Sequence, residues 1–451
     1  MSNGQGPTSP VDETHQICPT TPLVRASGSS ERSTLTDRSD TTGDEHEGTS
    51  ARGAKHHRWN FRPYSQRVPS PASWLPDHQL PVAATLSHAD ELVGQVSDLL
   101  FTYQARPGGI FELEEHLAFP NTRTVVTRIV PMPRKIPLLV ADALVALRAA
   151  LEHALFSEIE FRDGRLDEKT ARLVEIPASL KAEEFRAWIT KRAKNGPASL
   201  RYGSEIVRRI EGLQPFNRRD AENHPLARLV LHTNHAKHRT PAVTAVRIAA
   251  MYEEDRIPRS IRDLPPRPEE PLQVGDVIAE TPAGTQVLVA LFPTVGINRP
   301  GTDRWPILMR ELEEILHWVR TQAIPRLITG AEPPEPALPA RYEISVGHDD
   351  ERGAIAVGSS VSAADRHQER LGAASARIDL VDLIGRLEES PGEEQISAWL
   401  ADLTDAEVLE RVHRLNSTHS HNPDVVLHNL KVVKGLRDEA SAFEMNKVPS
   451  G

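Results

Sequence analysis

The chain has 451 residues, a formal net charge of −10 and a single cysteine, Cys18. One cysteine excludes an intramolecular disulfide, and the acidic balance argues against a protein that coats nucleic acid over its whole surface. No apolar stretch approaches the roughly 20 residues needed to cross a bilayer, so we expect a cytoplasmic protein with no membrane segment.

The composition divides the chain into four parts. Residues 1–83 are rich in Ser, Thr, Pro, Gly and charged side chains, which cannot bury enough apolar surface to offset the entropy of an ordered chain, so we expect disorder there. Residues 84–330 form the expected, mainly helical core. Residues 331–360 are a proline-rich linker and a stretch of uncertain structure, and residues 361–451 are a small acidic helical segment with a flexible end.

The predicted elements of the core follow one another with clear start and stop signals. Ser87 and Asp90 have the spacing of a capping box before an apolar run, and Pro225 suits the first position of a helix. We predict helices at residues 88–101, 138–156, 181–194, 199–211, 226–239 and 306–322, strand-like segments at 110–117 and 122–130, and a hairpin of strands 274–280 and 286–292. The expected fold class is α+β and mainly α, with a helical core, two small strand pairs, a disordered N-terminal tail and a helical C-terminal appendage.

The predicted helix at residues 138–156 carries Arg148 and His153, residue types that can cleave a phosphodiester without metal. The His would transfer a proton and the Arg would stabilise charge on phosphate oxygens. A straight helix places the two side chains about 140° apart, so a shared site would need a kink, a long Arg reach, or a second helix or subunit. The alternative is an i,i+4 ion pair between Arg148 and Glu152, with His153 on an alanine-rich face that another helix approaches.

The next predicted helix of interest ends in a dense polar cluster, residues 232–239. Leu226, Leu229, Val230 and Thr233 should face inward, and Arg228, His232, His235 and Arg239 should form the opposite stripe. Lys237, His238 and Arg239 are candidates for phosphate binding. A metal held by His232, His235 and His238 stays an alternative, although no acidic residue or cysteine completes a ligand set, and we assign no metal and expect no cofactor. The remaining alternative is a solvated basic stripe.

Basic residues also crowd the segment before this cluster. They are Lys191, Arg192, Lys194, Arg201, Arg208, Arg209, Arg218 and Arg219, and the acidic residues Glu183, Glu184, Glu205 and Glu211 are fewer. We weigh three interpretations: a surface that faces phosphates, a docking surface for the acidic C-terminal segment, and an ordinary solvated helix face. The N-terminal residues 55–64 interleave basic and aromatic side chains, which suits either a nucleic-acid contact or a linker that docks its aromatics on the core.

Three short segments carry a resemblance to known proteins. The run Leu-Arg-Ala-Ala-Leu-Glu-His at residues 147–153, Leu-Gln-Pro-Phe at 213–216 and Asn-His-Ala-Lys-His-Arg at 234–239 resemble an uncharacterised family of bacterial and phage proteins over about residues 84–330. The spacing of Arg148 and His153 also resembles the R-x(4–6)-H motif of HEPN-type ribonucleases, which implies catalysis by these two residues. Ala149 departs from the polar residue usual after that Arg, and the predicted strands depart from a plain HEPN bundle.

These patterns favour a protein that acts on nucleic acid, with RNA as its partner. The most specific form of this hypothesis is a metal-independent ribonuclease of a defence or toxin type. One competing hypothesis is a non-enzymatic protein-interaction module whose Arg and His motifs are structural. Its partner would be another protein or a second copy of itself. The other competing hypothesis is a His-based metal-binding protein. The sequence leaves open whether the chain is an enzyme.

Overall fold

The computed structural model describes residues 73–253, 264, 267–285, 287, 289–330, 332–334, 336–416 and 422–443. Nearly all of the predicted disordered segment, including residues 55–64 and Cys18, lies outside the described residues. The packed chain begins earlier than predicted, because Leu75, Val82 and Ala83 are already buried in the core.

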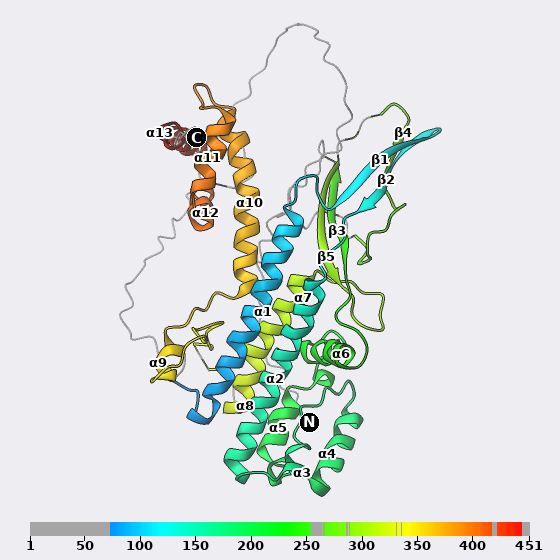
Figure 1. The fold of residues 1–451 in the computed structure, drawn as a ribbon, viewed down its shortest axis with the longest axis vertical. Helices are drawn as coiled ribbons and strands as arrows, with labels where there is room; N and C mark the ends of the chain where they lie inside the picture. Colours follow the sequence, from blue (N-terminus) through cyan, green and yellow to red (C-terminus); the bar gives the residue numbers. More distant parts are fainter. Residues whose placement is uncertain are drawn as a thin grey trace, which may run out of the picture.

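The protein is mostly helical, with two small antiparallel sheets (Figure 1). The helices of the first two thirds of the chain are α1 (Leu80–Gln104), α2 (Lys135–Asp163), α3 (Glu168–Ala171), α4 (Ala182–Asn195), α5 (Glu205–Gly212), α6 (Pro225–His238), α7 (Leu308–Trp318) and α8 (Ile324–Thr329). Those of the last third are α9 (Glu351–Ala356), α10 (Ala363–Gly385), α11 (Glu393–Asp402), α12 (Asp405–His413) and α13 (Pro423–Ala442). The strands are β1 (Phe111–Ala118), β2 (Asn121–Ile129), β3 (Thr244–Glu253), β4 (Val277–Pro282) and β5 (Val289–Ile297). This confirms the predicted fold class.

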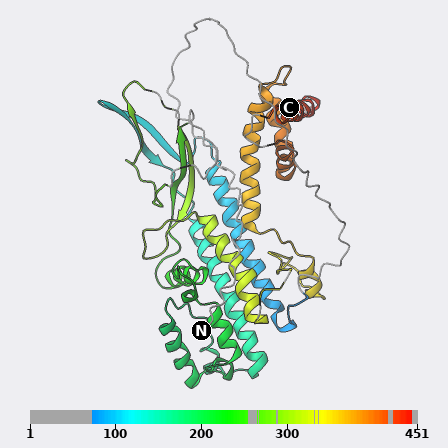
Figure 2. The ribbon, with the colours of Figure 1, turned by 180° about the vertical axis from the view of Figure 1, so that it is seen from behind.

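The long helices α1 and α2 lie side by side and form the centre of the core, with α7 and α8 against them (Figures 1 and 2). Four leucines of α2 recur at the spacing that places side chains on one face of an α-helix, and all four are buried: Leu144, Leu147, Leu151 and Leu155. Burying a leucine side chain contributes roughly 1.5–3 kcal/mol, so this stripe explains why α2 packs in this orientation.

Helix α1 begins at Leu80, so the predicted cap at Ser87 was wrong. Ser87 and Asp90 lie inside the helix, and both are buried. They hold other segments instead: the Ser87 hydroxyl accepts from the main-chain nitrogen of Tyr342 at 3.1 Å, and Asp90 accepts from that of Ala363, the first residue of α10, at 2.6 Å. The N-cap of α10 is Ser362, whose side chain accepts from the nitrogen of Asp365.

The predicted hairpin of residues 274–292 was also wrong. β4 joins β1 and β2 in a three-stranded sheet in the order β1-β2-β4, whereas β5 pairs with β3 in a separate two-stranded sheet. Strand β3 was not predicted. The first sheet is fastened by Glu280 of β4, which accepts from Asn121 and Arg123 of β2, and such long-range pairing is not visible in a local pattern.

The C-terminal helices form a second, smaller core. Ala373 and Leu380 of α10, Trp399 of α11 and Leu436 of α13 are among its buried residues. The first half of α10 instead packs on α1, and Leu338, Tyr342 and Ile355 belong to the main core. Helix α10 therefore connects the two cores, and α11–α13 lie at the end of the molecule opposite to α4 and α5 (Figures 1 and 2).

Candidate nucleic-acid interface

Arg148 lies on the part of α2 that faces the extended segment before α4. Its Nε donates to Oε1 of Glu152 at 2.7 Å, and its Nη2 donates to the carbonyl of Ile176 at 2.6 Å. Glu152 in turn accepts from the main-chain nitrogen of Ile176 at 3.0 Å. Burial raises the pKa of Glu152, opposed by the charge on Arg148 and the hydrogen bond from Ile176. The Arg148–Glu152 pair thus clamps both main-chain groups of Ile176.

Gln214 of the Leu-Gln-Pro-Phe motif holds the same extended segment from another element. Its side-chain oxygen accepts from the nitrogen of Ser179 at 2.9 Å, and its amide nitrogen donates to the carbonyl of Ile210 at 3.1 Å. Gln214 is fully buried, and the nitrogen of Phe216 donates to Ser179 at 3.3 Å. Two of the motifs that carry the sequence resemblance therefore fasten one segment to the core.

His153 turns to a different neighbour. Its ring is exposed, and its Nδ1 lies 3.3 Å from the hydroxyl of Thr85 on α1. Arg148 and His153 share no contact residue among the described part of the chain: one engages Glu152 and Ile176, the other Thr85. The structure does not bring them together around one group.

Helix α6 begins as predicted, with Pro225 at its first position and the His224 side chain accepting from the nitrogen of Leu226. Leu226, Leu229 and Thr233 are buried, as predicted. Arg228 and His232, however, were expected on the outer stripe and are each 4% exposed. The helical projection failed because a second helix, α7, covers that side of α6.

The residue responsible is Glu311 of α7, which the sequence did not single out. Arg228 donates to Oε2 of Glu311 at 2.6 Å, Arg299 donates to both of its oxygens at 2.8 and 3.0 Å, and the Nε2 of His232 lies 3.3 Å from Oε1. Burial alone would raise the pKa of Glu311, but hydrogen bonds from His232 and Arg299 and the charge on Arg228 outweigh it and lower this pKa to about 2. This buried network joins α6, α7 and the loop after β5.

Lys237, His238 and Arg239 are all exposed at the C-terminal end of α6. In the described structure, no side-chain hydrogen bond or ion pair occupies any of them. Their proximity comes from the local sequence alone. They are free to meet a ligand, although the partial negative charge of a helix C-terminus does not itself attract anions.

The alternative of a histidine metal site finds no geometric support. No group of three or more His, Cys, Asp or Glu side chains within the described ranges is arranged to hold a metal ion. His232 turns inward onto Glu311, whereas His238 is exposed.

Eight exposed cations belong to the segment that contains α4, α5 and α6, helices that lie in the lower half of Figure 1. We call this set the basic end: Lys191, Lys194, Arg201, Arg208, Arg218, Arg219, Lys237 and Arg239. In the described part of the chain none of these eight makes an ion pair with an acidic side chain. Arg192 and Arg209, also of this segment, are instead used internally, the first by Glu175 and the second by Glu205 and the last carbonyls of α8.

The acidic C-terminal helices do not cover these cations within the chain. Helices α11–α13 lie at the opposite end of the molecule in both views (Figures 1 and 2). The described C-terminal segment therefore leaves the basic end open to solvent. The interpretation of these cations as a docking surface for the acidic C-terminal segment is thus not supported.

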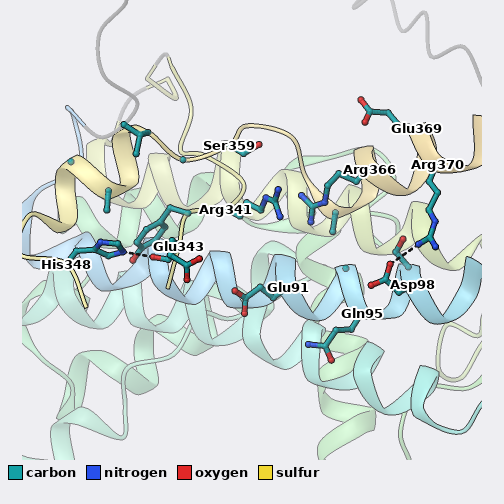
Figure 3. A pocket seen from close by; sticks show the side chains of 18 of the residues that line it. Glu91, Gln95, Asp98, Arg341, Glu343, His348, Ser359, Arg366, Glu369 and Arg370 are labelled. Atoms are coloured by element: carbon teal, nitrogen blue, oxygen red, sulfur yellow. Dashed lines mark hydrogen bonds and ion pairs between the residues drawn. The ribbon is translucent and has the colours of Figure 1, made fainter. Parts of the chain in front are cut away.

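A second polar surface is less suited to an anion. An open groove of about 1350 Å³ lies between α1 and the segment from Arg341 to Arg370 (Figure 3). Its lining holds seven Asp and Glu and three Arg. Two of the arginines are paired, Arg366 with Asp90 at 3.0 Å and Arg370 with Asp98 at 2.9 Å. The groove therefore has more acidic than basic side chains, unlike the segment of α4–α6.

None of the described helices is both long and apolar enough to span a membrane. Comparisons of the chain with known protein families, with curated proteins and with solved structures gave no match.

Proposed function

We propose that this protein binds nucleic acid through its basic end. We also propose that Arg148 and His153 do not form a catalytic site. The observation that carries the proposal is the set of eight exposed cations that have no acidic partner among the described residues. They lie between residues 181 and 241, where thirteen Lys and Arg against six Asp and Glu give a charge of +7 within a chain of charge −10. Unpaired Lys and Arg on one part of an acidic protein are the arrangement expected for local contacts to phosphates.

The contacts of Arg148 support an architectural role for the catalytic candidates. Two donors of the Arg148 guanidinium are used by Glu152 and by the carbonyl of Ile176, and its Nη1 is buried without a hydrogen-bond partner among the described residues. Because the side chain is only 15% exposed, its remaining donors face the interior and not a phosphate in solvent. General acid–base catalysis also needs the proton-transfer group within hydrogen-bond reach of the reacting atoms, and His153 contacts a different helix. Metal-independent RNA cleavage therefore stands as the alternative outcome of the test.

The test is binding of a fluorescently labelled 20-nucleotide RNA of mixed sequence to the full chain in EDTA, read by anisotropy and followed on a denaturing gel. One variant replaces four exposed cations of α4, α5 and the turn between them with Ala: Lys191, Lys194, Arg201 and Arg208. The matched control replaces four exposed cations elsewhere: Arg106, Lys135, Lys431 and Lys434.

We expect the first variant to bind at least tenfold more weakly and the control to bind like the wild type, with no cleavage in any sample. Absence of RNA binding by the wild type would overturn the proposal. RNA cleavage that disappears in a folded His153→Ala variant would replace it with the ribonuclease hypothesis.

A specific observation also favours protein interaction as a second candidate function. Val426, Leu427 and Leu430 of α13 are 60%, 63% and 40% exposed on neighbouring turns of one helix. Sedimentation of the full chain and of a Leu427→Ser/Leu430→Ser variant tests self-association through this face. A monomeric wild type would remove the second copy as the partner.

A further inference from the structure

Tyr202 projects from the turn between α4 and α5 and is 84% exposed. The turn is closed by the nitrogen of Ser204, which donates to the carbonyl of Arg201 at 3.1 Å. Gly203 follows the tyrosine with φ of +81°, in the region that residues with a Cβ rarely adopt. The glycine allows the chain to reverse directly behind the aromatic ring.

Side-chain hydrogen bonds hold this turn rigidly on the core. The Ser204 hydroxyl donates to the carbonyl of Ser199 at 2.6 Å and accepts from the nitrogen of Val207 at 3.2 Å. Asp163, at the end of α2, accepts from the nitrogen and the hydroxyl of Ser199 at 2.7 and 2.8 Å. Because the backbone is already fixed, a ligand that meets Tyr202 does not pay the entropy of ordering this turn.

Two cations of the basic end flank the ring along the backbone. Arg201 precedes it, and Arg208 follows one helical turn after Ser204, since the nitrogen of Arg208 donates to the carbonyl of Ser204 at 3.2 Å. Both arginines are exposed, and among the described residues neither they nor the Tyr202 ring make a side-chain contact with a polar or aromatic partner. A single exposed aromatic is ordinary on a protein surface, but one held on a fixed turn between two unpaired arginines has a defined ligand chemistry.

We infer that Tyr202 is a stacking platform for an unpaired base, and that the nucleic acid bound at the basic end is therefore single-stranded. This inference rests on the function proposed above. A base within a duplex has both faces covered by its neighbours, so a protruding ring finds a free face only on a single strand. Arg201 and Arg208 would then contact the phosphates on either side, the combination of stacking and backbone neutralisation that single-strand binders use.

The experiment compares the full chain with single-residue variants on two labelled probes, a 15-nucleotide oligo(U) RNA and a blunt 15-base-pair RNA duplex, by anisotropy at fixed salt. The variants are Tyr202→Ala, Tyr202→Phe and, as a matched control, Phe119→Ala. Phe119 is 89% exposed at the turn between β1 and β2, away from the basic end. Circular dichroism establishes that each variant is folded.

We expect the wild type to prefer the single strand. Tyr202→Ala should weaken binding to oligo(U) by about tenfold to a hundredfold and leave binding to the duplex unchanged, because stacking on one aromatic is lost. Tyr202→Phe and Phe119→Ala should bind like the wild type, since the first keeps the ring and the second lies elsewhere.

Equal affinity of the wild type for both probes, or a Tyr202→Ala variant that binds oligo(U) like the wild type, would overturn the single-strand inference while the proposed function stands. A Tyr202→Phe variant as weak as Tyr202→Ala would also overturn it, because the hydroxyl and not the ring would then make the contact. No binding of either probe by the wild type would overturn the proposed function itself.

Discussion

Arg148 donates to the main-chain carbonyl of Ile176 at 2.6 Å, across 28 residues of sequence. This bond links the segment before α4 to α2. His153 makes none of these contacts: it is exposed, and its Nδ1 lies 3.3 Å from the hydroxyl of Thr85.

The first prediction concerns this clamp. Arg148→Ala should lower the free energy of unfolding by about 2–4 kcal/mol, because Glu152 and the Ile176 carbonyl lose a largely buried partner. Urea unfolding followed by circular dichroism measures it. Arg172→Ala is the control: Arg172 also makes an i,i+4 pair, with Glu168 in the reverse order, but both side chains are at least 76% exposed. Its effect should be under about 0.5 kcal/mol, and an equal effect of the two substitutions would contradict the clamp.

Asp90 should hold α10 on α1. Asp90→Ala leaves the first nitrogen of α10 and the guanidinium of Arg366 without their buried acceptor, which we expect to cost about 2–4 kcal/mol. Limited proteolysis should then cut the segment before α10 faster than in the wild type. Asp98→Ala removes an ion pair with Arg370 in which the aspartate side chain is 74% exposed. This control should therefore change the stability and the rate of proteolysis little. A protease-resistant Asp90→Ala variant would show that α10 is held by other contacts.

Glu311 should make the protein sensitive to acid at low pH. Its folded pKa of about 2 lies below the ordinary value of 4.5, so the unfolded chain takes up the proton first as the pH falls. The contribution to stability is complete above pH 4.5 and is lost between about 4.5 and 2, a loss of about 3 kcal/mol.

The measurement for Glu311 is the urea midpoint as a function of pH. Glu311→Gln should lack this part of the acid dependence and should be about 3–5 kcal/mol less stable at pH 7, because Arg228 and Arg299 stay buried without their counter-charge. Glu314→Gln, at a carboxylate that is 41% exposed and also meets Arg228, is the control with a smaller expected effect. Equal acid sensitivity of Glu311→Gln and wild type would refute the assignment.

His367 should make the stability depend on pH in a higher range than Glu311 does. Its Nδ1 lies 2.8 Å from the hydroxyl of Ser97, and burial, with the charge of Arg370 and against that of Asp98, lowers its pKa to about 4. The unfolded chain takes up a proton below about 6.5 and the folded chain only below about 4, so stability falls by about 3 kcal/mol as the pH drops through this window.

The variant His367→Gln keeps a hydrogen-bonding group without the titration, so its stability should change less between pH 7 and 4. Ser97→Ala keeps the histidine, so it should be less stable at every pH with the slope retained. The pKa of His224 is also lowered to about 4 by burial and by Arg218 and Arg228, so the test is the difference between variant and wild type. Identical slopes for His367→Gln and wild type would contradict the prediction.

Patterns confined to one element were predictable from sequence. The leucine stripe of α2, the start of α6 at Pro225 and the β1–β2 hairpin all depend on neighbours within a few residues, and the structure has them. Features that depend on distant partners were not. Asp90 accepts from the first nitrogen of a helix 273 residues later, and Arg228 and His232 are buried against Glu311. Strands β4 and β5 belong to different sheets. The basic end was visible as a charge imbalance, but its separation from the acidic helices required the fold.

The most direct test of nucleic-acid binding at the basic end is the salt dependence of the affinity for oligo(U). Each phosphate neutralised contributes about 0.7 to the slope of log Kd against log salt for a single strand. Replacing Lys191, Lys194, Arg201 and Arg208 with Ala should therefore reduce this slope by about 2 to 3, whereas replacing Arg106, Lys135, Lys431 and Lys434 should leave it unchanged. An unchanged slope in the first variant, or an equal reduction in both, would contradict the account.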